Sequence, residues 1–373
     1  MAASQILDPL GDHLEARGTP VFRVRSFNST IPCRNTYKID FDLRKIKRRA
    51  GRWYKARNFL RKRVVDRTKT SRILNRYCYQ EMIQVLRPAM ILAVDPSPEL
   101  CRTARDRGVK IANIAHGFGY PSDCKVHGRL ARARIRQRAE PHFFIAFDRV
   151  TQKTRKMGDK GKDTRTLLSR RCHFPPRPST RLGGIRQRRK KTVLVAMQWG
   201  YDGMVPELAN ILPDGIMASA LQKVIRTCPD VTWLIKWHPV QLRDPDLYRR
   251  VRNYIKTNLS IPSNQVVDID LDPIQDALAM SDLLITMCSM AVYEAAAQGV
   301  PSLALCPSLK KGGMFEKLFR DLKKEGILKK TRMRATDIRA AIFSRFARRR
   351  SKRRTLRAPE LHLLVERLLR EDA

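Results

Sequence analysis

The sequence predicts an α/β protein built on two doubly wound parallel sheets, one in each of two domains. Two observations lead to this fold class. Through the second half of the chain, short apolar runs alternate with amphipathic stretches, as βαβ units require, and the first half repeats this alternation less regularly. A length of 373 residues also suits two domains better than one. We therefore expect two Rossmann-like domains that face each other across a central cleft.

The second half shows the alternation most clearly. Each of its strands is apolar at nearly every position, which indicates burial on both faces of a parallel sheet. The expected strands are 192–197, 232–235, 265–268, 282–285 and 302–305, and the expected helices are 215–227, 245–257, 273–279 and 291–298.

The first half is predicted to hold strands at 89–94, 110–115 and 143–147, with a helix at 99–107. Residues 6–24 have the pattern of a helix followed by a strand. A Rossmann-like domain normally opens with a strand and a glycine-bearing turn, and neither precedes this segment. We therefore expect the N-terminal domain to lack its first strand.

A stretch rich in proline, glycine and arginine at 174–191 has the composition of an exposed linker and marks the domain boundary. The expected division is an N-terminal domain with a basic insertion at 1–180, a C-terminal domain at 181–345, and a basic segment with an amphipathic helix at 346–373. We expect that last helix to pack back across the domain boundary, with membrane insertion as the alternative. Its apolar face is formed by Leu361, Leu364, Val365 and Leu368.

The formal net charge of +41 indicates a polyanionic partner, which can be nucleic acid, an anionic membrane surface or a phosphorylated substrate. Segment 44–63 interleaves aromatic and basic side chains, a pattern that suits anionic lipid or single-stranded nucleic acid. We favour membrane docking, with a general basic bias as the alternative. The docking candidates are Arg48, Arg49, Trp53, Tyr54 and Arg57.

The eight cysteines include no Cys-x-x-Cys pair, which argues against a zinc ribbon or a disulfide framework and favours a reducing compartment. The sequence has no run of about 18 apolar residues and no signal-peptide pattern at its start. We therefore expect a cytoplasmic protein, held peripherally on the inner face of the plasma membrane if the basic segment docks there.

In a doubly wound sheet, the loops after the carboxyl ends of the strands line the ligand crevice. Gly200 lies in such a loop, where the backbone can approach a phosphate closely, although an ordinary turn is equally compatible. Lys236 and His238 follow the next strand. A bound diphosphate would explain a cation beside a directional donor, whereas a structural histidine is the alternative.

Two further strand ends carry polar residues. Ser289 begins a predicted helix, a position that suits an anion. Glu294 lies about one and a half turns further on, where a carboxylate can accept hydrogen bonds from ribose hydroxyls; a solvated surface charge is the alternative. His116 ends a strand in the first half and suits a general base, or else only a hydrogen bond to a loop carbonyl.

Taken together, these residues resemble the glycosyltransferases of the GT-B fold, in particular the branch that makes bacterial capsule and teichoic-acid polymers, including CDP-glycerol glycerophosphotransferases. The resemblance spans about residues 90–328 and is carried by the His-Gly at 116–117, the Lys-x-His-Pro at 236–239 and the Ser-x4-Glu-Ala-x3-Gly-x-Pro at 289–301. Met290 departs from it, because related sequences commonly have serine, threonine or glycine there. The implied roles are catalytic base for His116, donor-phosphate contacts for Lys236, His238, Ser289 and Gly200, and ribose contact for Glu294.

The resemblance implies transfer from a nucleotide-sugar or nucleotide-polyol donor to a hydroxyl of a cell-surface glycan or lipid-linked acceptor. In chemistry of the GT-B type, basic side chains offset the charge of the leaving diphosphate, so the resemblance implies no metal or other cofactor. One alternative is a nucleotide-sugar 2-epimerase of the same architecture. Another is a non-catalytic nucleic-acid-binding protein, which would bind polyanions with a steep salt dependence.

Overall fold

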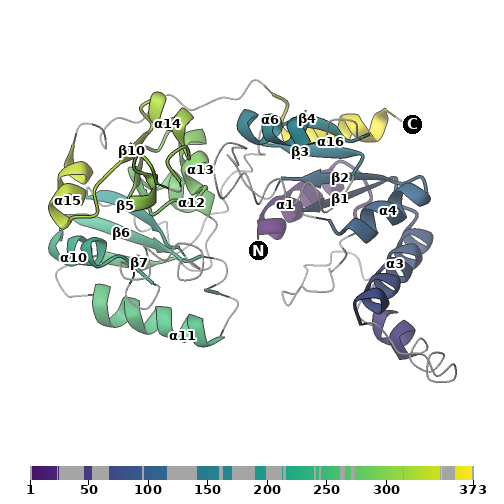
Figure 1. Ribbon diagram of the computed structural model, residues 1–373, viewed down its shortest axis with the longest axis horizontal. Helices are drawn as coiled ribbons and strands as arrows, with labels where there is room; N and C mark the ends of the chain where they lie inside the picture. The colour runs from purple at the N-terminus through teal and green to yellow at the C-terminus, as the bar shows by residue number, and fades with distance from the viewer. Residues whose placement is uncertain are drawn as a thin grey trace. The chain divides into compact units, whose positions relative to one another are not determined.

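The computed structural model describes residues 2–22, 24, 46–52, 67–94, 96–115, 141–158, 163–169, 190–198, 212, 216–238, 241–242, 245–260, 265–269, 274–313, 315–344, 346 and 358–371 (Figure 1). The chain divides into two compact units, each built on one parallel sheet. The first unit comprises Met1–Phe118, Leu130–His173 and Arg357–Ala373, and the second comprises Gly119–Arg129 and Phe174–Leu356.

The second unit has a six-stranded sheet in the order β10-β9-β8-β5-β6-β7. From β5 the chain winds outward through β6 and β7, and it then returns to the other side of β5 for β8, β9 and β10. This is the Rossmann order, with its reversal between β5 and β8. The strands are β5 (Lys191–Ala196), β6 (Val231–Lys236), β7 (Gln265–Asp268), β8 (Leu283–Thr286), β9 (Ser302–Ala304) and β10 (Leu328–Lys330).

Helices connect these strands, and they contact one another in two groups, α10 with α15 and α12 with α13 (Figure 1). The expected helix at 215–227 starts only at Ser219, because Ala218 is extended and buried. The helices are α10 (Ser219–Thr227), α11 (Pro245–Tyr254) with a π-helical continuation η2 (Ile255–Leu259), α12 (Ile274–Ala279), α13 (Ala291–Ala297), a 3-10 turn η3 (Pro307–Leu309), α14 (Arg320–Lys324) and α15 (Ala335–Phe343).

Side chains fix the pairing of β5 with β8 at both ends. At the amino end, the Asp282 carboxylate accepts a hydrogen bond from the Thr192 N–H at 2.9 Å, and the Asp282 N–H donates to the Thr192 carbonyl at 2.8 Å. At the carboxyl end, the Thr286 hydroxyl donates to the Ala196 carbonyl at 3.1 Å. The reversal point of the sheet is therefore held in a single register.

The first unit has a four-stranded parallel sheet in the order β1-β2-β3-β4. No described residue before Met90 belongs to a strand, and the expected lack of a first strand stays a prediction. Within 6–24 we predicted a helix followed by a strand. The helix is present, but the strand prediction was wrong, because the described residues after the helix form no strand. The strands are β1 (Met90–Val94), β2 (Lys110–Ile114), β3 (Phe143–Ala146) and β4 (Arg165–Leu168), and the helices are α1 (Ala2–Ala16), α3 (Arg67–Leu86), α4 (Pro98–Asp106), α6 (Arg149–Gly158) and α16 (Leu361–Arg370).

The last helix, α16, packs in the first unit against α1 (Figure 1). The Arg17 guanidinium pairs with the Glu366 carboxylate at 2.9 Å, and the rings of His13 and His362 lie 4.2 Å apart. The predicted apolar face is buried at all four of its positions, which confirms that this helix returns across the domain boundary. These positions are Leu361, Leu364, Val365 and Leu368.

None of the helices in the described ranges combines the length and the apolar character that a membrane crossing requires.

Neighbouring leucines in α16 test its packing. Leu364 is 1% exposed, and its replacement by alanine should lower the free energy of unfolding by about 2 to 5 kcal/mol through a core cavity. Leu363 is 49% exposed, and Leu363→Ala should change it by no more than about 0.5 kcal/mol. Urea denaturation followed by circular dichroism measures both. Equal losses in the two variants would contradict the observed packing face.

Acid should destabilise the first unit. Burial is the main cause that lowers the pKa of His142, followed by the charges of Arg105 and Lys110. The His142 Nδ1 also accepts a hydrogen bond from the Ile111 N–H at 3.2 Å, which a protonated nitrogen cannot do. Below about pH 6.5 the unfolded chain therefore binds more protons than the folded chain, so the free energy of unfolding decreases as the pH is lowered.

Urea midpoints measured on both sides of this pH would show the loss. The matched variant is His142→Gln, whose amide oxygen can accept the same hydrogen bond without titrating. It should show a weaker pH dependence than the wild type, and an unchanged dependence would mean that His142 is not a source of the acid sensitivity.

Candidate functional site

The candidate site lies at the carboxyl edge of the second unit's sheet, around its reversal point. Lys236 is the last residue of β6 and is only 7% exposed. Its ammonium group donates a hydrogen bond to the Ile269 carbonyl, just past β7, at 3.2 Å. A cation held here in surroundings of low dielectric constant interacts strongly with any anion that reaches it.

His238 follows β6 in a tight turn closed by Gln241. The His238 N–H donates to the Gln241 side-chain oxygen at 2.7 Å, and the Gln241 N–H donates to the His238 carbonyl at 2.9 Å. This reciprocal pair fixes the backbone of His238 and leaves its imidazole partly buried. The Lys-x-His pattern thus places a buried ammonium group and a backbone-anchored imidazole at one strand end.

Two buried donors beside this turn lack an acceptor within the described part of the chain. They are the indole N–H of Trp237, whose ring contacts that of Tyr248 at 5.0 Å, and the side-chain amide nitrogen of Gln241. A buried polar group without a partner costs about 1 to 3 kcal/mol, so such groups call for an explanation. Both lie within five residues of Lys236 in sequence.

Thr286 connects the ends of β5 and β8. Besides donating to the Ala196 carbonyl, its hydroxyl accepts hydrogen bonds from the Gln198 side chain at 3.3 Å and from the Ser289 N–H at 3.4 Å. The Ser289 hydroxyl in turn accepts from the Ala291 N–H at 3.2 Å, at the start of α13. Ser289 is therefore positioned by the strand end and already serves as a local cap.

Glu294 lies in α13 and faces α12. Its carboxylate accepts a hydrogen bond from the Gln275 side chain at 2.9 Å, and Gln298 donates to the Gln275 carbonyl at 3.1 Å. Gly299 ends the helix with a positive φ of 74°, which glycine adopts without strain. Glu294 is thus a partly buried, hydrogen-bonded carboxylate rather than a fully solvated charge.

The structure places Lys236, His238, Ser289 and Glu294 in one unit, with the first three at the ends of β6 and β8 on either side of β5. Arg48 and Arg49 belong to the first unit, on the exposed side of a helical stretch at 46–52. The remaining candidates lie outside the described residues: His116, Gly200, Trp53, Tyr54 and Arg57.

Sequence patterns did not single out Thr286, Gln241 or Gln275. Thr286 has a recognisable signal, because it is a polar residue that ends an otherwise apolar strand. Gln241 and Gln275 have none, since their partners come from a turn and from a neighbouring helix that only the fold brings together.

The described residues contain no group of three or more histidine, cysteine, aspartate or glutamate side chains that could hold a metal ion.

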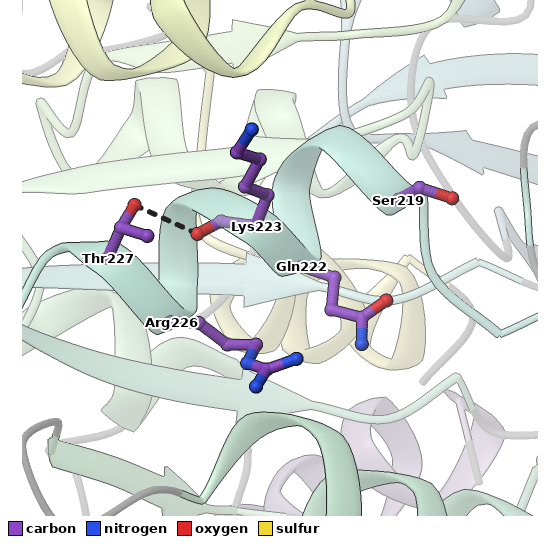
Figure 2. A pocket seen from close by; sticks show the side chains of 5 residues that line it. All are labelled: Ser219, Gln222, Lys223, Arg226 and Thr227. Atoms are coloured by element: carbon purple, nitrogen blue, oxygen red, sulfur yellow. Dashed lines mark hydrogen bonds between the residues drawn. The ribbon is translucent and has the colours of Figure 1, made fainter.

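Figure 2 shows a surface hollow lined by side chains of a single helix, α10. Its lining includes none of the strand-end residues described above. Among the described residues, no side chain from a second element lines the hollow, and the Thr227 hydroxyl donates to the Lys223 carbonyl at 2.9 Å. We therefore place the candidate site at the strand ends. The hollow is lined by Ser219, Gln222, Lys223, Arg226 and Thr227.

No protein-family model and no curated protein sequence matches this chain. Solved structures do match it. A UDP-GlcNAc 2-epimerase from Methanocaldococcus jannaschii, in complex with UDP-GlcNAc and UDP, superposes with a TM-score of 0.58 at 9% identity over 98% of this chain and 96% of that one. The Streptomyces sp. SF2575 glycosyltransferase SsfS6, complexed with thymidine diphosphate, gives 0.51 at 13% identity over 99% and 96%. The chain thus has the α/β fold of GT-B proteins, with two Rossmann-like domains.

Proposed function

We propose that this protein is a glycosyltransferase that takes a nucleotide-activated sugar or polyol phosphate as donor. The observation that carries the proposal is the set of polar side chains at the carboxyl ends of β6 and β8, on both sides of β5 in a Rossmann-ordered sheet. In open α/β sheets, nucleotides bind in the crevice outside these strand ends, at the reversal point.

The donor diphosphate is assigned to the end of β6. Lys236 supplies the charge, and His238 supplies a directional donor on a fixed backbone. The Trp237 and Gln241 side-chain nitrogens, which have no acceptor among the described residues, support the assignment, because a ligand rich in acceptor oxygens would offset their burial cost. Basic side chains would then stabilise the charge that develops on the leaving group.

The ribose is assigned to Glu294. A carboxylate in α13 that already accepts a hydrogen bond from an amide has further lone pairs for the hydroxyls of a sugar. Ser289, three residues past β8, would contact the donor phosphates through its hydroxyl. His116 as catalytic base and Gly200 as a phosphate contact remain predictions from the sequence.

The structural neighbours support a nucleotide-bound donor, since SsfS6 holds thymidine diphosphate and the M. jannaschii epimerase holds UDP-GlcNAc and UDP. They also favour a second candidate function, nucleotide-sugar 2-epimerisation, because the epimerase superposes with a TM-score of 0.58. Proton NMR of UDP-GlcNAc incubated with the protein separates the two. Inversion at C2 without an acceptor would establish the epimerase, whereas nucleotide release that requires a glycan or lipid-linked hydroxyl would establish the transferase.

Donor binding should depend on Glu294. We expect Glu294→Gln to weaken the affinity for the preferred nucleotide about 10- to 100-fold, because hydrogen bonds to charged groups contribute about 1.5 to 3 kcal/mol. Calorimetric titration with UDP-, CDP-, GDP- and TDP-linked sugars and CDP-glycerol measures this. The matched control is Glu325→Gln. Glu325 is an exposed carboxylate just before β10, toward the amino ends of the strands and away from the carboxyl ends that form the candidate site.

If Glu294→Gln and the wild type bind the nucleotide donor with equal affinity, Glu294 does not contact the ribose. A different result would replace the proposal by the nucleic-acid-binding alternative. In that case no nucleotide donor binds, whereas heparin and oligonucleotides bind with an affinity that decreases as the salt concentration is raised.

The acceptor side is assigned to an anionic membrane surface that carries lipid-linked acceptors. Exposed apolar side chains on α3 support this: Ile73 and Tyr77 are four residues apart and so share one face, and Val85 is also exposed on this helix. Arg48 and Arg49 belong to the same unit. Apolar side chains combined with basic ones are what an interfacial surface requires.

Binding to vesicles that contain phosphatidylserine tests this surface. Replacing both Arg48 and Arg49 by alanine should weaken binding about 30-fold, since each basic residue near an anionic membrane contributes about 1 kcal/mol. The control replaces two exposed basic residues of α10, Lys223 and Arg226, and changes the net charge equally. Sedimentation with neutral phosphatidylcholine vesicles gives the baseline. Equal weakening by both double variants would indicate a general charge effect instead of docking.

A further inference from the structure

Two thiols lie side by side past the ends of β8 and β9. These strands are paired in parallel, with Thr286 opposite Ala304. The ladder continues beyond them, because the Cys306 N–H donates to the Met287 carbonyl at 3.1 Å. Cys288 and Cys306 each lie two residues past this last pair, so their Cα atoms should be about one strand spacing, or about 4.8 Å, apart.

That separation falls within the range that a disulfide can span, which is about 4.4 to 6.8 Å between Cα atoms. Both residues are buried, and both are in the thiol form, without a disulfide bond, in the structure. The two side chains already meet, because the Cys288 side chain is hydrogen-bonded to Cys306.

The surroundings favour the thiolate of Cys306. The pKa of Cys306 is lowered, first by a hydrogen bond from the Cys288 side chain and then by donors of Ser308 and Leu309, although burial opposes the shift. Buried cysteines elsewhere differ. Burial raises the pKa of Cys78, in the core of the first unit, to about 11. The thiolate is the nucleophile in cysteine oxidation, so reactivity should concentrate at Cys306.

We propose that Cys288 and Cys306 form a redox-active dithiol that a small hydroperoxide oxidises to an intramolecular disulfide. The Cys306 sulfur attacks the O–O bond of hydrogen peroxide; an S–O bond forms, and the leaving hydroxide takes up the thiol proton as water. The Cys288 sulfur then attacks the sulfenic acid, so that the S–S bond forms, the S–O bond breaks and a second water leaves. Two thiols are oxidised and one peroxide is reduced to two waters.

Hydrogen peroxide is the fitting oxidant because both sulfur atoms are buried, and a bulkier disulfide reagent would have to displace the chain around them. Cys288 directly precedes Ser289, so the disulfide would form at the border of the candidate site. The oxidation chemistry itself is independent of the proposed donor binding.

The test treats the full reduced chain with limiting hydrogen peroxide, alkylates the remaining thiols and maps the peptides by mass spectrometry. We expect a reducible Cys288–Cys306 cross-link before any change at Cys78. Because the pKa of Cys306 is lowered while burial raises that of Cys78 to about 11, the thiolate fraction should be larger at Cys306, and Cys306 should react first.

Two variants assign the steps. Cys288→Ser should leave a sulfenic acid on Cys306 that a dimedone probe traps, and Cys78→Ser should leave the cross-link unchanged. The wild-type map alone can overturn the proposal, whether or not a variant folds. It does so if Cys306 stays reduced while Cys78 is modified, or if Cys306 pairs with another cysteine instead of Cys288.

Discussion

The pairing of β5 with β8 is the interaction on which the second unit depends, because the chain reverses its winding there. Asp282 fixes this pairing at the amino end and Thr286 fixes it at the carboxyl end. The Thr286 hydroxyl also accepts the Ser289 N–H, so the side chain that completes the strand pair positions the loop that follows. The scaffold and the candidate site therefore share one residue, and any change in the register of these two strands would displace both.

Lys236 differs from most basic residues of this chain in being buried. Most of the described Lys and Arg side chains are partly or fully exposed, and their interactions are screened by salt over about 8 to 10 Å. Lys236 is different, because its ammonium group is buried and bonded to a backbone carbonyl. Salt screens a buried charge much less than an exposed one. In the proposed function, the net charge would attract polyanions in general, whereas Lys236 would contact the donor phosphates at a defined position.

Central strands were predictable from the sequence to within one or two residues, because strands buried on both faces read as apolar runs. The edge strands β4 and β10 were missed. Arg165 begins β4, and Lys329 and Lys330 end β10, so neither shows the apolar run or the alternation that marks a strand. Charged edges are how sheets avoid further pairing. Partners such as Gln275 for Glu294 depend on how helices pack, which no local pattern records.

The return of α16 to the first unit has a consequence for biosynthesis. Most of the second unit lies in the chain between β4 of the first unit and α16, the helix that packs against α1. During translation the second unit can therefore complete its sheet before α16 has been synthesised. Until then the first unit lacks one of its packed helices, and the apolar side chains that pack against α16 can be bound by chaperones.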